Sequence, residues 1–161
     1  MTTEPIPQCD FEADKLRSRF TATICADINA IRPVVISVMQ IIKGMKCGAG
    51  HEFEVELALH EALANAIIHG CGKDPSKMIQ VCVACDESRG LLIVVRDPGP
   101  GFDPASIPSP IMGENVFAEH GRGIYLVNQL MDEVRFERGG TEIHMRKFPA
   151  ASDSSGNGTA E

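Results

Sequence analysis

Glutamate, asparagine and histidine occur at helical spacing in segment 53–69, between apolar positions. At about 100° per residue, Glu61, Asn65 and His69 form one narrow polar stripe on this predicted helix. Glu61 and Asn65 stand at positions i and i+4, so their side chains point in the same direction. A carboxylate beside an amide oxygen suits a hard divalent ion such as Mg²⁺, and the carboxylate can also accept a proton. The alternative is an ordinary polar stripe that faces solvent.

A second group of residues, Asp97-Pro-Gly99-Pro-Gly101-Phe102, directly follows a strongly apolar predicted strand. At a buried strand end, a carboxylate can accept the amino hydrogen of adenine, whereas the oxygen of guanine would be repelled there. Gly99 and Gly101 permit positive φ and close approach of the backbone to a flat base. Asp97 would therefore select adenine. The alternative is a plain Gly/Pro turn after a strand.

A third group, Gly121-Arg122-Gly123, opens a predicted helix. Free N–H groups at a helix N-terminus attract phosphate, and glycines let the anion come close. A GxG at a helix start is weak evidence when taken alone. Further along, Thr141 follows two glycines, and in isolation it is equally a β-branched strand residue.

The length and composition of the chain indicate what kind of protein carries these residues. The 161 residues suffice for one domain, and 43% hydrophobic with 23% charged residues is ordinary globular usage. A net charge of −7, without a basic stripe, argues against nonspecific binding of nucleic acid backbones. The sequence has neither a signal peptide pattern nor a long apolar run, which predicts a cytoplasmic protein.

The chain has six cysteines. Without an export signal they are expected to be reduced thiols rather than a disulfide framework. Cys82 and Cys85 form a CxxC, but they lie in an alternating segment where an odd spacing sends the side chains to opposite faces. A metal or redox site from this pair is therefore not expected.

The hydrophobic periodicity predicts a strand, two helices, a strand pair, a long loop, a helix and a final hairpin. The expected ranges are a strand at 17–24, a helix from a cap at Asp27 or Asn29 to 45, a helix at 53–69 closed by Gly70, strands at 77–85 and 91–96, a helix at 124–131, and strands at 134–137 and 141–147. Segment 97–121 is rich in proline and glycine, and loops of that length are usually functional. The order favours a mostly antiparallel sheet with helices on one face.

Together these motifs resemble the nucleotide-binding boxes of the GHKL ATPases. The matching residues are Glu61-x₃-Asn65-Ala66-x₂-His69-Gly70, Asp97-x-Gly99-x-Gly101-Phe102, Gly121-x-Gly123 and Gly140-Thr141, and the resemblance extends over about 15–147. Within that superfamily, Gly123-Ile-Tyr-Leu-Val127 and the following 130–134 resemble the anti-sigma factor serine/threonine kinases. Sensor histidine kinases are less similar, because their phosphoacceptor domain is missing.

The resemblance implies an α/β (α+β) fold, a two-layer Bergerat-type sandwich with a mixed, mostly antiparallel sheet and about three helices on one face. It implies a flexible N-terminus at 1–14, an ATPase domain at 15–148 with an ATP lid at about 103–121, and a disordered tail at 149–161. The implied cofactors are ATP or ADP and Mg²⁺. The implied partners are an anti-anti-sigma protein of the STAS type, a sigma factor and a second copy of the chain.

The resemblance also implies a role for each candidate residue. Glu61 would be the general base on a partner's serine or threonine hydroxyl, Asn65 would coordinate Mg²⁺, and Asp97 would bind adenine with Thr141 nearby. The remaining cofactor-binding residues would be His69, Gly99, Gly101, Gly121, Arg122 and Gly123. One departure is that no Lys or Arg lies between Phe102 and Gly121, so Arg122 is the nearest cation for the γ-phosphate. Two alternatives are a non-catalytic nucleotide-binding module and an unrelated α/β protein with coincidental motifs.

Overall fold

The computed structural model describes residues 16–45, 47, 50–86, 88–103 and 119–149, with only the backbone described for 16–18, 45 and 119–122. The strands are β1 (Leu16–Cys25), β2 (Met78–Asp86), β3 (Gly90–Arg96), β4 (Glu133–Glu137) and β5 (Glu142–Lys147). The helices are α1 (Ile31–Met45), α2 (Glu52–Asn65) and α3 (Glu119–Leu130). The predicted N-terminus (1–14), residues 104–118 of the predicted lid and residues 150–161 of the predicted tail lie outside the described residues.

The element order agrees with the prediction, with two differences at helix ends. The second helix stops at Asn65 and continues as a π turn, η3 (Ala66–Gly70), instead of running unbroken to His69. The third helix begins at Glu119, so Gly121 and Gly123 lie within its first turns rather than ahead of it.

The five strands form one sheet in the order β1-β2-β3-β5-β4, and every described pairing is antiparallel. The expectation of a mixed sheet is therefore wrong for the described strands. The two antiparallel helices between β1 and β2 return the chain to the end of the sheet where β1 finished, so Cys25 pairs with Met78. The pairs β2–β3 and β4–β5 are hairpins, and β3 and β5, which are separated along the chain by α3 and β4, also pair antiparallel.

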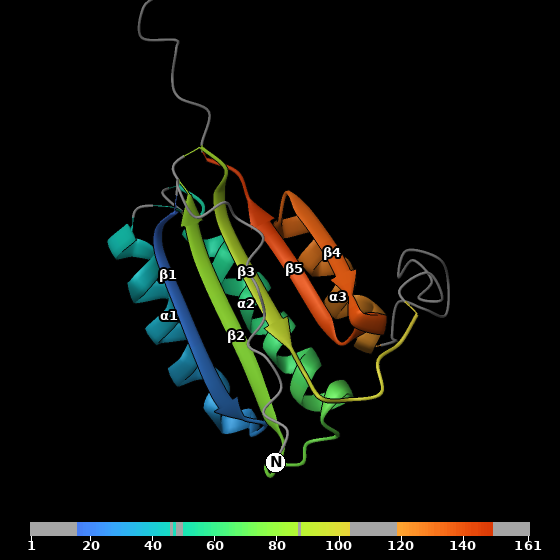
Figure 1. The fold of residues 1–161 in the computed structure, drawn as a ribbon. Helices are drawn as coiled ribbons and strands as arrows, with labels where there is room; N and C mark the ends of the chain where they lie inside the picture. The colour runs from blue at the N-terminus through green and yellow to red at the C-terminus, as the bar shows by residue number, and fades with distance from the viewer. Residues whose placement is uncertain (1–15, 46, 48–49, 87, 104–118, 150–161) are drawn as a thin grey trace, which may run out of the picture.

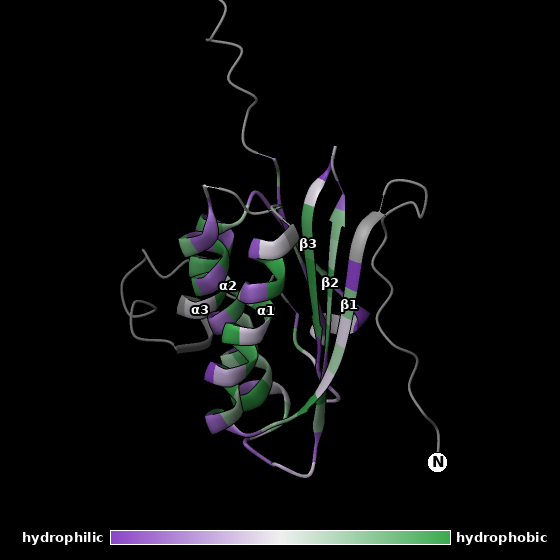
Figure 2. Ribbon diagram, turned by 90° about the vertical axis from the view of Figure 1, so that its left-hand side faces the viewer, coloured by the Kyte–Doolittle hydropathy of each residue, from purple (hydrophilic) through white to green (hydrophobic). Residues whose placement is uncertain are grey.

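The molecule has two layers, with all three helices on one face of the sheet (Figures 1 and 2). Figure 2 shows the layers edge on, with apolar residues between them. The largest fully buried side chains of this core include Ile42, Leu59, Leu63, Ile67, Ile79, Ile93 and Met145. This two-layer α/β sandwich confirms the predicted fold class.

Local interactions explain where several elements begin. Asp27 caps the short 3₁₀ turn η2 (Ile28–Ala30) that leads into α1, since its side chain accepts a hydrogen bond from the Asn29 N–H at 2.9 Å. At the β2–β3 hairpin, Gly90 has φ of 90°, and a Cβ there would collide with the Lys147 carbonyl. The sequence pattern predicted a cap at either Asp27 or Asn29, and it predicted the two strands on either side of this turn.

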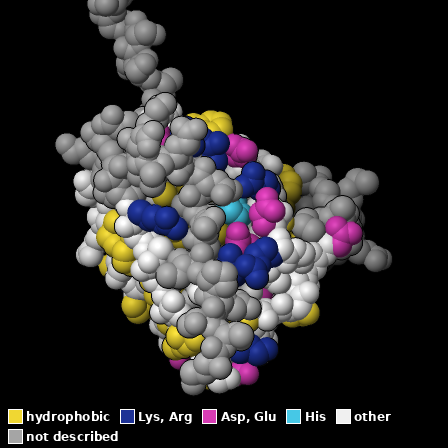
Figure 3. Space-filling view, viewed as in Figure 1, with side chains coloured by type: hydrophobic (Ala, Val, Ile, Leu, Met, Phe, Trp, Pro, Cys, Tyr) yellow, Lys and Arg dark blue, Asp and Glu magenta, His cyan; other side chains and the backbone are white. Residues whose placement is uncertain are grey.

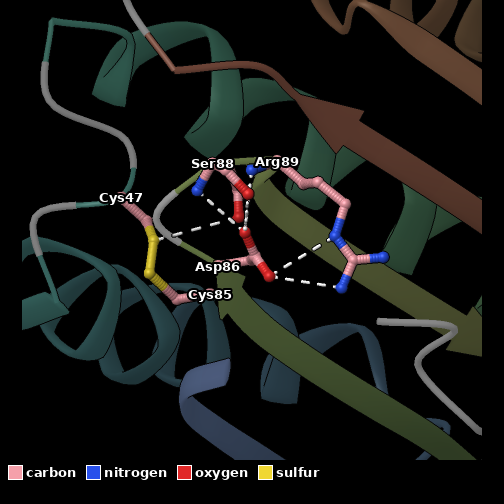
Figure 4. The surroundings of a disulfide bond; sticks show 6 residues. Cys47, Cys85, Asp86, Ser88 and Arg89 are labelled. Carbon is pink, nitrogen blue, oxygen red and sulfur yellow. Dashed lines mark hydrogen bonds and ion pairs between the residues drawn. A yellow bond between two sulfur atoms is a disulfide. The ribbon is translucent and has the colours of Figure 1, made fainter. Parts of the chain in front are cut away.

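The prediction of reduced cysteines is wrong for Cys47, Cys82 and Cys85, which are all disulfide-bonded. Cys47, in the connection between α1 and α2, forms a disulfide with Cys85 near the end of β2, with a Cα–Cα distance of 6.0 Å (Figure 4). Packing of the helix layer on the sheet brings together two cysteines that are 38 residues apart. Cys25 and Cys71 are free thiols.

Cys82 and Cys85 lie on opposite faces of the sheet, as their spacing predicts. Cys85 reaches the helix side, whereas Cys82 packs with Ala84, Leu92 and Val94 in a small cluster separate from the main core. Among the residues that the structure describes, no group of three His, Cys, Asp or Glu side chains could hold a metal ion. None of the described helices has the length and apolar character that a bilayer crossing requires.

Candidate functional site

A cleft lies between α2, α3 and one end of the sheet. It encloses about 580 Å³, including space open to solvent. Its lining residues are Glu61, Ala62, Asn65, Ala66, His69, Gly70, Val95, Asp97, Gly101, Phe102, Gly123, Ile124, Val127, Phe136, Gly140, Thr141 and Ile143. The set combines an apolar interior with a few polar groups, as in sites that hold a flat organic ligand.

The polar stripe of α2 faces this cleft. Glu61 and Asn65 both line it and are half-buried, while His69 is exposed at its edge. The opposite side of α2 buries Val55, Leu59 and Leu63 in the core. Burial of the apolar side fixes the orientation of α2, so the polar stripe lines the cleft and does not simply face bulk solvent.

The π turn at the end of α2 brings the helix against the strand that carries Asp97. The Cys71 N–H donates to the Ala66 carbonyl at 2.9 Å, which closes the wider π-type turn. At Gly70, a Cβ would collide with the carboxylate of Asp97. Gly70 is therefore required for the contact between α2 and the end of β3, a role beyond the predicted helix stop.

Asp97 is half-buried, and its carboxylate lies at the base of the cleft. Burial raises the pKa of Asp97, and a hydrogen bond from the Gly99 N–H at 2.8 Å only partly opposes that effect. Its own N–H donates to the Thr141 carbonyl at 2.9 Å. Asp97 and Thr141, which the sequence placed in one site, are thus direct neighbours.

Gly99 supports Asp97 instead of lining the cleft. Its N–H holds one oxygen of the carboxylate, and a Cβ at this position would collide with the Gly70 carbonyl. Gly99 therefore lies behind Asp97, at the crossing of two backbone segments, and its predicted role in cofactor binding stays a prediction.

The loop after β3 lies tightly against the turn between β4 and β5. Gly101 has φ of 77°, and a Cβ there would collide with the Gly139 carbonyl. The Phe102 N–H donates to that same carbonyl at 2.9 Å. The Phe102 ring meets Phe136 edge to face, with ring centroids 5.3 Å apart. The pair forms an aromatic wall of the cleft.

Glycine at position 123 allows α3 to approach α2. A Cβ there would lie 3.2 Å from a carboxylate oxygen of Glu61, so a side chain would crowd the polar stripe. Gly121 and Arg122 lie in the first turns of α3, where only the backbone is described, so the position of the Arg122 side chain lies outside the description. The expected roles of these two residues stay predictions.

The apolar lining of the cleft is not indicated by the polar motifs of the sequence. Val95 and Ile143 come from β3 and β5, Ile124 and Val127 come from α3, and Phe136 comes from β4. Alternation along β4 could have placed Phe136 on the inner face with Val134. The pairing of that face with Phe102 depends on the long-range contact between two loops.

Cys71 carries a free thiol that no sequence motif indicates. It is buried beside Asp97, and burial, followed by the negative charge of Asp97, raises the pKa of the thiol. A thiol with a raised pKa is a poor nucleophile, so Cys71 contributes packing rather than chemistry.

The comparison with protein families agrees with this geometry. The family model described as the histidine kinase-like ATPase domain matches residues 24–147. The chain belongs to the histidine kinase-like ATPase domain family. The match begins near the end of β1 and ends with β5, and it includes every residue that lines the cleft.

Within this family, the chain is similar to anti-sigma factors and serine-protein kinases. The chain is 30% identical over 106 residues to an anti-sigma F factor from Bacillus cytotoxicus, covering 63% of this chain and 72% of that protein. It is 29% identical over 129 residues to the serine-protein kinase RsbW of Bacillus licheniformis, covering 73% and 80%. It is 32% identical over 111 residues to RsbW of Staphylococcus epidermidis, covering 64% and 69%. The resemblance to anti-sigma kinases, first indicated by the motifs, is confirmed.

Proposed function

We propose that this protein is an anti-sigma factor that binds ATP in the cleft and phosphorylates a serine or threonine of an anti-anti-sigma partner. The observation that carries the proposal is that Glu61, Asn65 and Asp97, from two separated segments of the chain, line one cleft. Two relatives of the chain are named an anti-sigma F factor and a serine-protein kinase, which supports the same function.

The base would enter between the aromatic wall and the apolar floor. Asp97 would accept the amino hydrogen of adenine, and Thr141 lies beside it. Val95 and Ile143 supply the apolar surface under the ring, and Phe102 supplies the wall.

The residues at the other end of the cleft fit a phosphate-bound Mg²⁺. The amide oxygen of Asn65 is a suitable hard ligand, and Mg²⁺ usually completes its coordination with phosphate oxygens and water. When bound, the ion would neutralise phosphate charge. Glu61, next to Asn65 on the helix, would accept the proton of the attacking hydroxyl. In-line transfer then depends mainly on positioning.

A second candidate is a module of the same fold that holds nucleotide and a partner without phosphate transfer. It is favoured by the lack of Lys and Arg between Phe102 and Gly121, which leaves Arg122 as the nearest cation for the γ-phosphate. The proposed partners are a STAS-type protein, a sigma factor and a second copy of the chain, and the proposed location is the cytoplasm. Sedimentation of the purified protein would test the dimer.

Transfer of label from γ-labelled ATP to the STAS partner separates the two candidates. We expect Glu61→Ala to reduce transfer by at least about a hundredfold, the usual minimum effect of a general base, and to retain ADP binding. His60→Ala is the matched control, because His60 is the exposed neighbour on the same helix. Transfer that is absent in the wild type, with ADP still bound, would support the binding module. No heat with ADP and Mg²⁺ would reject both candidates.

A further inference from the structure

Three polar side chains form a buried cluster on the sheet face away from the helices. Glu142 uses one carboxylate oxygen for the Nε of Arg96 at 2.5 Å and the other for the Nε2 of His144 at 2.6 Å. The side chains of Arg96, Glu142 and His144 are only 7%, 7% and 6% exposed. Figure 3 views the molecule from this face, where acidic, basic and histidine side chains gather near the middle.

The position of this cluster in the sheet is informative. Arg96 and Glu142 are Cα partners and form the last pair of the β3–β5 ladder. The next residues along the two strands are Asp97 and Thr141, both in the cleft and joined by the 2.9 Å backbone hydrogen bond. The cluster therefore lies at the end of the β3–β5 ladder, one residue away from Asp97 and Thr141, the two residues proposed to contact the base.

Its bonding pattern fixes the carboxylate plane. Each oxygen of Glu142 has its own partner, and Arg96 also reaches Gln80 on β2, with Nη1 3.5 Å from the amide oxygen. The interaction thus extends across β2, β3 and β5. Burial alone would raise the pKa of Glu142, but hydrogen bonds from His144 and Arg96 and the charge of Arg96 lower it.

The energetics of buried ion pairs indicate that such a cluster fixes the positions of the strands more than it stabilises the fold. Desolvation offsets most of the attraction in a buried ion pair, so its net stabilisation is small. Removing one partner is costly, because it leaves a buried charge unpaired. A bridging carboxylate at a strand end therefore mainly restricts where the two strands can lie.

We propose that Arg96, Glu142 and His144 are positioning residues for nucleotide binding: they hold the ends of β3 and β5 together so that Asp97 and Thr141 meet one base. The inference rests on the proposed function of the cleft. The cluster touches no ligand and acts through Asp97. His144 supports Arg96 indirectly, by fixing the carboxylate that both side chains share.

A double-mutant cycle on ADP affinity tests the action through Asp97. We expect Glu142→Ala to weaken ADP binding about tenfold, and Glu142→Gln to weaken it less, because glutamine keeps an acceptor for Arg96. In an Asp97→Asn background, the loss from Glu142→Ala should shrink to about twofold or less. Equal losses in both backgrounds would overturn the proposal.

The matched control is Glu133→Ala. It removes the ion pair between Glu133 and Arg146 at 3.2 Å, which also joins neighbouring strands but lies away from Asp97. Its ADP affinity should stay within about twofold of the wild type. A loss equal to that of Glu142→Ala would mean that any cross-strand pair has the same effect, and the proposal would fail.

Amide hydrogen exchange tests the strand ends without nucleotide. Exchange at the Asp97 N–H should accelerate at least about tenfold in Glu142→Ala and remain near the wild-type rate in Glu133→Ala. Glu142→Gln serves if the alanine variant does not fold. An unchanged Asp97 rate in a folded Glu142 variant rejects the positioning role, whatever the nucleotide result. A wild type that binds no ADP rejects the proposed function, even if the exchange rate responds.

Discussion

Asp86 and Asp97 each lie at the end of a strand in the same sheet, before a glycine-containing turn, but their surroundings differ. Asp86 accepts hydrogen bonds from the N–H and hydroxyl of Ser88 and from the N–H and guanidinium of Arg89 (Figure 4). Among the described residues, Asp97 accepts one, from Gly99. One carboxylate is saturated by its own turn, and the other keeps acceptor capacity in a cleft.

The pKa shifts of the two aspartates follow this difference. Burial acts to raise both, but hydrogen bonds from Arg89 and Ser88 outweigh it at Asp86, and the pKa of Asp86 falls far below its ordinary value. At Asp97 burial prevails and the pKa rises. The same residue type therefore serves structure at one end of the sheet and is available for a ligand at the other.

The largest expected effect concerns the disulfide beside Asp86. Loss of the Cys47–Cys85 bridge, which joins cysteines at a sequence separation of 38, should lower the free energy of unfolding by about 3 to 4 kcal/mol, since the unfolded chain gains freedom. Denaturation of Cys85→Ser measures this loss, and Cys25→Ser, at an exposed free cysteine, is the control. Thiol titration showing both Cys47 and Cys85 free in the oxidised protein would contradict the prediction.

Asp86→Ala should be nearly as damaging to stability. The substitution leaves the turn N–H groups of Ser88 and Arg89 without their acceptor, which costs about 3 kcal/mol. The affinity for ADP, measured well below the unfolding temperature, should not change. A loss of ADP affinity as large as the loss of stability would contradict the assignment of a structural role to Asp86 and a ligand-binding role to Asp97.

Asp97→Asn should have the converse effect. We expect ADP to bind more weakly by about 2 kcal/mol, roughly thirtyfold, because a charged hydrogen bond to the base is lost. The free energy of unfolding should change little or rise slightly, since a partly desolvated charge is removed. Calorimetry and chemical denaturation of the same variant provide both numbers, and a purely destabilised variant would contradict the assignment.

The smallest effect is the dependence on pH. Asp86 and Glu142 have lowered pKa values, so their stabilisation is complete above their ordinary values of 3.8 and 4.5 and is lost as pH falls below them. Asp97 acts in the opposite sense, because its raised pKa makes the folded state bind a proton more readily. As the pH is lowered, the affinity for ADP should therefore fall before the protein begins to unfold. In Asp97→Asn, the affinity for ADP should no longer fall ahead of unfolding.

Sequence reasoning was most effective where neighbours along the chain determine the geometry. Helical periodicity placed Glu61 and Asn65 on one stripe. The cap was narrowed to Asp27 or Asn29 because capping involves adjacent residues, and the structure shows that it is Asp27. The π turn at Ala66–Gly70 was not foreseen, since it depends on packing of α2 against β3. Phe136 was missed for a similar reason, because its partner Phe102 lies on a distant loop.

The sequence alone determined the order of elements, the polar stripe and the glycine-rich turns, because these depend on local periodicity and backbone freedom. Only the tertiary structure decided that Cys47 meets Cys85, that every described strand pair is antiparallel, and that Arg96, Glu142 and His144 join behind Asp97. Such contacts depend on how the layers pack and on strand register. Neither is expressed in the spacing of residues within one segment.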